Sequence, residues 1–188
     1  MPSQVADVLR SLAAALQSAG ARWYLFGAQA ALIHGVSRLT ADVDATVWWD
    51  PAQAEALLAV LGANGFESRS TSPDFIARTR VVPLVHAATR MQVDLVLGGP
   101  GLEELFLQRA VERDVEGVRV PVATAEDLIA MKVLGGRAKD LDDVRALLAA
   151  NAGRLDLAHV RDLLGELELA LDRSDLIAEL EKAVLETA

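Results

Sequence analysis

The sequence predicts an α+β fold, with strands and helices mixed in the first part and a helical C-terminal part. Short apolar or alternating runs typical of strands are interspersed with helical patterns over the first two thirds of the chain. Apolar residues at helical spacing continue from Thr124 almost to the end. No repeat, low-complexity stretch or flexible linker separates the two parts. We therefore expect a core over residues 1–122 and a helical subdomain over residues 123–188 that completes the active site.

Composition narrows the possible functions. The chain has 188 residues, of which 52% are hydrophobic and 24% charged, values typical of a globular protein. It has no cysteine, which excludes disulfides, thiolate zinc sites and a cysteine nucleophile. The formal net charge of -9 argues against a protein that wraps a long nucleic-acid duplex. No long apolar segment is present, so we expect a cytoplasmic protein that does not span a membrane.

The N-terminal pattern is helix, strand, tight turn and helix. Apolar residues recur every three or four positions in residues 5–16 and predict an amphipathic helix that ends at Gly20. Residues 22–26 form a short apolar strand that leads directly into Gly27, Ala28 and an alanine-rich helix. Free backbone N–H groups at such a helix start favour an anion such as a triphosphate. A turn that needs a small residue only for packing is the alternative.

The next elements follow from alternation and capping signals. Residues 43–49 predict a strand, after which Asp50 as N-cap and Pro51 in the first turn begin a helix. Residues 80–86 and 91–97 predict two strands of a hairpin, ended by the glycines that follow. Thr124 with Asp127 resembles a capping box and opens the helical C-terminal part.

Three aspartates form the first candidate site. Alternate residues of a strand share a face, so Asp42 and Asp44 point the same way, opposite the apolar residues between them. Asp94 repeats this pattern on the last predicted strand and can join the pair if the two strands are neighbours. Crowded carboxylates need a cation, and Mg²⁺ or Mn²⁺ prefers such oxygen ligands. The alternative is that Asp42 and Asp44 only begin an edge strand on its solvent side.

A second candidate segment lies in the helical part. Lys132 is surrounded in sequence by apolar residues, so its ammonium either reaches a phosphate or extends along the helix to water. Arg137, Asp140 and Asp143 follow in a charged turn. These two aspartates are second-rank site candidates, or caps and surface charges of the next helix, and Arg137 is a partner for either.

These motifs together resemble the AbiEii-like branch of the nucleotidyltransferase superfamily over residues 22–148. The residues that carry the resemblance are Gly27-Ala28, Arg38-x-Thr40-x-Asp42-x-Asp44, Val93-Asp94-Leu95-Val96, Lys132 and Arg137-x-Lys139-Asp140-x-x-Asp143. The resemblance implies a mixed sheet flanked by helices. It also implies divalent metal held by three aspartates, and transfer of a nucleotide from a nucleoside triphosphate to a hydroxyl with release of pyrophosphate.

The resemblance also implies a role for each matching residue. Asp42 and Asp44 correspond to metal ligands, and Asp94 to the third ligand and a candidate base. Lys132 corresponds to a catalytic contact to the triphosphate. Residues implied on the nucleotide side are Gly27, Ala28, Arg38, Thr40, Arg137 and Asp140. Ala28 departs from the glycine or serine common at its position, so a possible hydroxyl contact is lost.

The acceptor has no signature in the sequence. Members of the AbiEii-like branch include toxins that modify RNA and are neutralised by an antitoxin, so an RNA acceptor and an antitoxin partner are one hypothesis. The acidic net charge favours a second, a small molecule such as an aminoglycoside or a protein side chain. A third is a catalytically silent scaffold that binds a nucleotide or a partner, against which the intact aspartate trio argues.

Overall fold

The computed structural model describes residues 3–37, 40–70 and 72–187. The chain divides into two compact units. The first consists of residues 1–29 and 39–123, and the second of residues 30–38 and 124–188. The predicted functional division into residues 1–122 and 123–188 stays a prediction.

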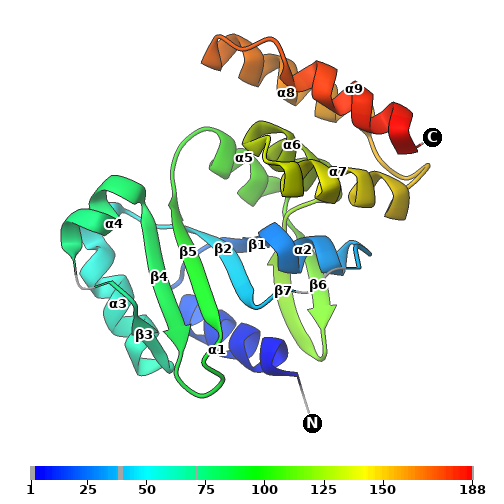
Figure 1. Ribbon diagram of the computed structural model, residues 1–188. Helices are drawn as coiled ribbons and strands as arrows, with labels where there is room; N and C mark the ends of the chain where they lie inside the picture. The colour runs from blue at the N-terminus through cyan, green and yellow to red at the C-terminus, as the bar shows by residue number, and fades with distance from the viewer. Residues whose placement is uncertain (1–2, 38–39, 71, 188) are drawn as a thin grey trace. The chain divides into compact units, whose positions relative to one another are not determined.

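The first unit is built on a seven-stranded sheet in the order β3-β4-β5-β2-β1-β7-β6 (Figure 1). Strands β1 and β7 are parallel, as are β2 and β5, and the other neighbouring pairs are antiparallel. The predicted α+β class and mixed sheet are thereby confirmed. The strands are β1 (Trp23–Phe26), β2 (Asp42–Trp48), β3 (Phe66–Ser68), β4 (Val81–His86), β5 (Gln92–Gly98), β6 (Val111–Val115) and β7 (Val118–Val122).

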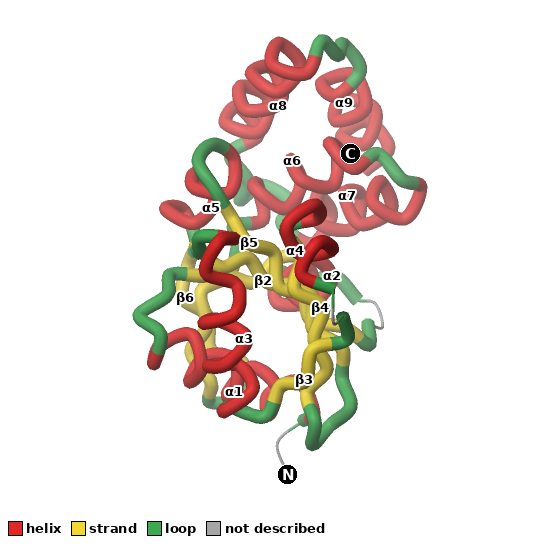
Figure 2. The backbone as a smooth tube through the Cα atoms, turned by 90° about the vertical axis from the view of Figure 1, so that its left-hand side faces the viewer, coloured by secondary structure: helices red, strands yellow, loops and turns green. Residues whose placement is uncertain are grey.

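Helices α1 and α3 contact each other and lie on the same side of this sheet (Figure 2). Their apolar residues, among them Leu9, Leu12, Leu57 and Leu61, are fully buried. Asp50 caps the turn before α3, because its Oδ1 accepts a hydrogen bond of 2.9 Å from the Ala52 N–H. The helical elements are α1 (Gln4–Ser18), η1 (Pro51–Gln53), α3 (Ala54–Ala63), α4 (Pro73–Thr79) and α5 (Leu102–Arg109), while α2 (Gly27–Ile33) runs from the first unit into the second.

All four predicted strands are present within one residue of their expected bounds, and the hairpin of β4 and β5 is confirmed. Local sequence patterns did not predict β3, α4, α5 or the hairpin of β6 and β7. Strand β3 is only three residues long, too short for a periodic signal. Strand β7 did carry a signal, because its valines alternate after a Glu116-Gly117 turn in which both residues have positive φ.

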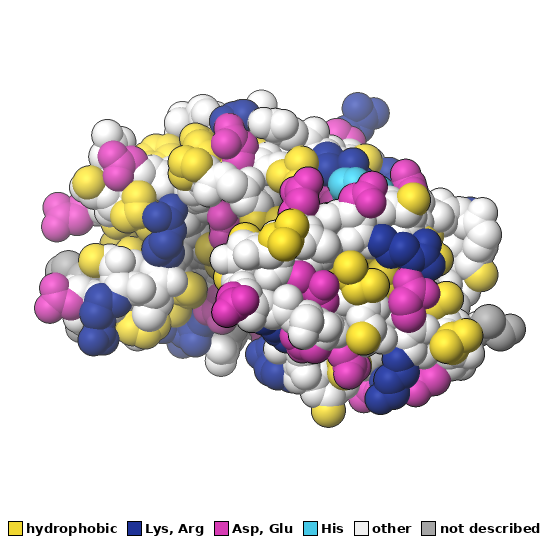
Figure 3. All heavy atoms as spheres, turned by 90° about the horizontal axis from the view of Figure 1, so that it is seen from above, with side chains coloured by type: hydrophobic (Ala, Val, Ile, Leu, Met, Phe, Trp, Pro, Cys, Tyr) yellow, Lys and Arg dark blue, Asp and Glu magenta, His cyan; other side chains and the backbone are white. Residues whose placement is uncertain are grey.

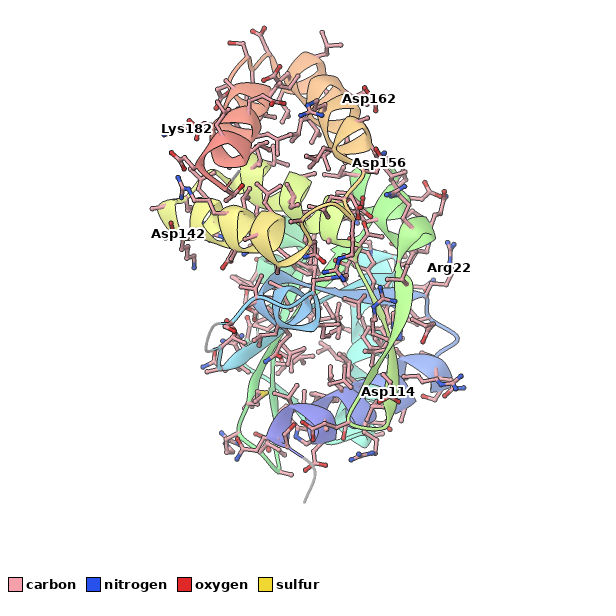
Figure 4. All side chains as sticks on the ribbon, turned by 90° about the vertical axis from the view of Figure 1, so that its right-hand side faces the viewer. Arg22, Asp114, Asp142, Asp156, Asp162 and Lys182 are labelled. Carbon is pink, nitrogen blue, oxygen red and sulfur yellow. The ribbon has the colours of Figure 1, made fainter. Side chains whose placement is uncertain are left out.

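The second unit is helical, as predicted for the last third of the chain. Its helices are α6 (Ala125–Gly135), α7 (Ala138–Ala150), α8 (Leu157–Leu171) and α9 (Leu176–Thr187). Thr124 caps α6 by accepting a hydrogen bond of 3.1 Å from the Asp127 N–H, which confirms the predicted cap. Asp156 caps α8 in the same way through the His159 N–H, at 3.0 Å (Figure 4). None of the helices in the described ranges is long and apolar enough to cross a membrane.

Candidate active site

Two carboxylates lie side by side on neighbouring strands of the first unit. Strands β2 and β5 are parallel, and their register pairs Asp44 with Asp94 and Asp42 with Gln92. Alternate side chains share a face, so all four of these residues are on one side of the sheet. The residues between them, such as Val43 and Ala45, are fully buried on the other side. The expectation that Asp94 joins the pair through neighbouring strands is therefore confirmed at the level of strand register.

Gly27 brings the backbone of the first turn against Asp44. Strand β1 pairs with β2 so that Phe26 lies opposite Asp44, which places the following glycine beside the carboxylate. Gly27 has a φ of +67°, and a Cβ added there would lie 2.1 Å from Asp44 Oδ2. The predicted strand, tight turn and helix are present. In the structure it is the Asp44 carboxylate that lies against Gly27 in this turn. A phosphate contact at Gly27 and Ala28 stays a prediction.

Asp42 is held at the start of β2 by a neighbouring hydroxyl. Thr40 Oγ1 donates a hydrogen bond to Asp42 Oδ1. Thr40 therefore orients a predicted metal ligand, a local contact between residues two apart. Ala28 is buried. Arg38, which the sequence analysis placed on the nucleotide side, lies outside the described residues.

Arg69 is a further residue of the site that the sequence analysis missed. Its Nη2 forms an ion pair with Asp94 Oδ1, and its Nε donates to the Leu84 carbonyl at 2.9 Å. Its backbone N–H also bonds the Pro83 carbonyl at 2.8 Å, next to Asp94 across the β4–β5 pair. The contact spans 25 residues of sequence and starts in a serine-rich stretch without strand periodicity, so no local pattern indicated it.

The carboxylates fit a divalent metal in their chemistry. Asp44 and Asp94 offer oxygen ligands on adjacent strands, and the Asp44 carboxylate lies against the Gly27 backbone, where a Cβ would need to be. Mg²⁺ and Mn²⁺ are commonly bound by one or two carboxylates together with substrate phosphates. Within the described ranges, no three His, Asp or Glu side chains are arranged so that they could hold a metal ion together. Asp42 instead bonds Thr40, and Asp94 bonds Arg69.

The predicted residues of the helical part form their own cluster inside the second unit. Lys132 Nζ donates to Asp143 Oδ2 at 2.7 Å and to Asp140 Oδ1 at 3.2 Å. Arg137 Nε donates to Asp140 Oδ2 at 2.5 Å. The Lys132 side chain is 13% exposed and that of Asp140 is 1% exposed, so these are internal ion pairs. Asp140 and Asp143 are buried partners of Lys132, and Arg137 pairs with Asp140.

This cluster is balanced electrostatically. Burial alone would raise the pKa of Asp140, but the hydrogen bonds and charges of Arg137 and Lys132 outweigh it and lower the pKa below its ordinary value of 3.8. Gly135 leaves room for this carboxylate, since a Cβ there would lie 3.0 Å from Asp140 Oδ2. Asp140 is thus held ionised between two cations that link the end of α6 to the start of α7.

A family model described as "Nucleotidyltransferase of unknown function (DUF6036)" matches residues 6–177. Among functionally curated proteins, none matches the chain in sequence.

Several solved structures have a similar fold with a TM-score above 0.5. ANT(2")-Ia in complex with adenylyl-2"-tobramycin has a TM-score of 0.61 at 12% identity, covering 90% of this chain and 99% of that one. An antigenic nucleotidyltransferase-like protein from Paracoccidioides brasiliensis has a TM-score of 0.56 at 19% identity, covering 93% of this chain and 90% of that one. The lincosamide antibiotic adenylyltransferase LnuA, lincomycin-bound, has a TM-score of 0.53 at 13% identity, covering 79% of this chain and 98% of that one. At these identities the likeness is one of fold.

Proposed function

Because the chain belongs to the DUF6036 family of nucleotidyltransferases, we propose that its three aspartates serve metal-dependent transfer of a nucleotide from a nucleoside triphosphate to a hydroxyl group. The observation that carries the proposal is the register of β2 and β5, which sets Asp44 beside Asp94 on one face of the sheet. Gly27, whose backbone leaves no room for a side chain beside Asp44, supports it.

In the proposed reaction the acceptor hydroxyl oxygen attacks the α-phosphorus of the triphosphate. A new P–O bond forms, the bond between the α-phosphorus and the oxygen leading to the β-phosphate breaks, and pyrophosphate leaves with that oxygen. Asp94 takes the hydroxyl proton. Asp42, Asp44 and Asp94 would hold Mg²⁺ or Mn²⁺, which when bound supplies positive charge against the carboxylates and the phosphates. Thr40 keeps Asp42 oriented.

We propose a small hydroxylated molecule as the acceptor. The net charge of -9 gives little attraction for a polyanion. Figure 3 shows acidic and basic side chains interspersed on the face that it draws. Two proteins of similar fold are named with tobramycin and lincomycin, which are small hydroxylated acceptors of the proposed kind. The RNA acceptor and antitoxin implied by the AbiEii-like resemblance are tested as the alternative.

The direct test is transfer of label from each of the four α-³²P nucleoside triphosphates, with Mg²⁺, to a panel of aminoglycosides and lincosamides or to total RNA. We expect label on a small molecule, and a loss of at least about a hundredfold in Asp44→Asn and Asp94→Asn. Asp50→Asn is the matched control, because it makes the same change at a helix cap, where Asn is equally suitable. Label on RNA alone would move the acceptor to RNA. No label on any acceptor would favour a silent nucleotide-binding scaffold.

A further inference from the structure

Arg69 places a fixed positive charge against a proposed metal ligand. Its Nη2 meets Asp94 Oδ1, while its Nε is tied to the Leu84 carbonyl at 2.9 Å. The backbone N–H of the same residue bonds the Pro83 carbonyl at 2.8 Å. Both the main chain and the inner end of the guanidinium are therefore anchored to β4. Moving the guanidinium away from Asp94 would break the hydrogen bond between Arg69 Nε and the Leu84 carbonyl.

This ion pair is open to solvent. The side chains of Arg69 and Asp94 are 33% and 43% exposed. An exposed pair contributes little to the free energy of unfolding, roughly 1 kcal/mol or less. Its exposure instead lets a ligand approach both groups. The guanidinium pairs with Oδ1 of Asp94, so Oδ2 is the oxygen with which a divalent metal ion would interact.

From this geometry we propose that Arg69 makes the site select a dication bound to a nucleoside triphosphate over the free dication. The inference rests on the function proposed above. A free dication at Asp94 is repelled by the anchored guanidinium, which already neutralises part of the carboxylate charge. The dication–triphosphate complex carries net negative charge, so the same guanidinium attracts it and can donate hydrogen bonds to a phosphate oxygen. Arg69 is thus a substrate-binding residue whose effect has opposite sign for the two ligands.

The test measures both affinities without any transfer. Free Mn²⁺ is titrated by electron paramagnetic resonance, and the titration is repeated with Mn²⁺ and each α,β-methylene nucleoside triphosphate, which cannot release pyrophosphate. For Arg69→Gln we expect free Mn²⁺ to bind about tenfold more tightly and the Mn²⁺–triphosphate complex about tenfold more weakly. Arg69→Lys keeps the charge, so its affinity for free Mn²⁺ should stay near that of the unchanged protein.

Arg80→Gln is the matched control. Arg80 Nε donates to the Leu97 carbonyl at 2.8 Å, the same kind of bond to a strand that Arg69 makes to Leu84. The control therefore removes a guanidinium and an anchor of the same type, and we expect both affinities to be unchanged.

The outcomes separate the two proposals. If Arg69→Gln weakens both affinities together, its role is structural and the inference is overturned. If it changes neither, the inference is overturned as well, while the proposed function stands. If the unchanged protein binds neither free Mn²⁺ nor the Mn²⁺–triphosphate complex, the proposed function fails and this inference fails with it.

Discussion

At Gly27 the backbone conformation and the space around the α-carbon both demand glycine. The φ of +67° is one that residues with a Cβ adopt at a cost of about 1–2 kcal/mol. The 2.1 Å approach of Asp44 Oδ2 to the position of a Cβ adds a steric conflict with a proposed metal ligand. The local sequence predicted a turn here, but only the pairing of β1 with β2 shows what approaches it.

Gly27→Ala should therefore affect both stability and the site. We expect a loss of about 1–3 kcal/mol in the free energy of unfolding beyond the backbone cost, and a loss of nucleotidyl transfer, because Asp44 must move. Urea denaturation and the transfer assay measure the two effects. Gly20→Ala is the control, since Gly20 has a similar φ of +64° and nothing within 4 Å of a Cβ. Equal effects of the two substitutions would contradict the proposed conflict with Asp44.

The contribution of His86 to the stability of the protein depends on pH. Its Nδ1 and Nε2 lie 3.0 Å and 3.1 Å from the hydroxyls of Thr89 and Ser11. Burial lowers the pKa of His86, although the charge of Asp7 raises it in part. The unfolded chain, with an ordinary pKa of about 6.5 for this histidine, therefore binds the proton at a higher pH than the folded one. The contribution of neutral His86 to the free energy of unfolding is therefore fully present above the pKa of the unfolded chain, and it is lost as pH falls below that pKa.

The corresponding measurement is the free energy of unfolding between pH 5 and pH 8, for the unchanged protein and for His86→Gln. We expect the unchanged protein to lose stability relative to the variant as pH falls below about 6.5. Other titrating groups are common to both proteins, so the difference isolates His86. A difference that does not vary with pH would contradict the prediction.

At the scale of elements, the junction of α6 and α7 is held by buried charge. Lys132 near the end of α6 reaches Asp140 and Asp143 on α7, and both carboxylates are buried. The sequence showed a lone lysine in an apolar helix but left two interpretations open. The ammonium does not extend to water but pairs with carboxylates of α7. This contact depends on how α7 folds back on α6, and that packing has no signature in the residues around Lys132. A phosphate contact by Lys132 stays a prediction.

Lys132→Met should destabilise the protein far more than Arg137→Ala. Removing the ammonium takes one cation away from two buried carboxylates, and breaking a buried ion pair typically costs about 3–5 kcal/mol. The Arg137 side chain is 67% exposed, and Asp140 keeps Lys132 as a partner when Arg137 is removed, so we expect a smaller loss of about 1–2 kcal/mol. Thermal and urea unfolding of both variants measure the difference. Similar losses for the two substitutions would show that Lys132 does not compensate the buried charge of the cluster.

For the whole molecule, the sequence predicted most of the fold and part of the site. Strand alternation and helix caps identify the four central strands and the helical last third, because these signals are local. The aspartates were found because alternation puts them on one face of their strands. Arg69 was not found, because its contact with Asp94 depends on the pairing of β4 with β5 and on where the chain turns after β3. Long-range pairing of this kind leaves no local pattern.

The charge of the whole chain leads to a prediction about RNA. With a formal net charge of -9, the protein can neutralise few phosphates, and each one neutralised on a single strand contributes about 0.7 to the slope of log affinity against log salt. We therefore expect weak binding of a 20-nucleotide RNA and a slope below about 2 between 50 and 200 mM salt. Filter binding at several salt concentrations measures both quantities. A slope of 4 or more would reveal a local basic groove and would make RNA, rather than a small molecule, the acceptor to pursue.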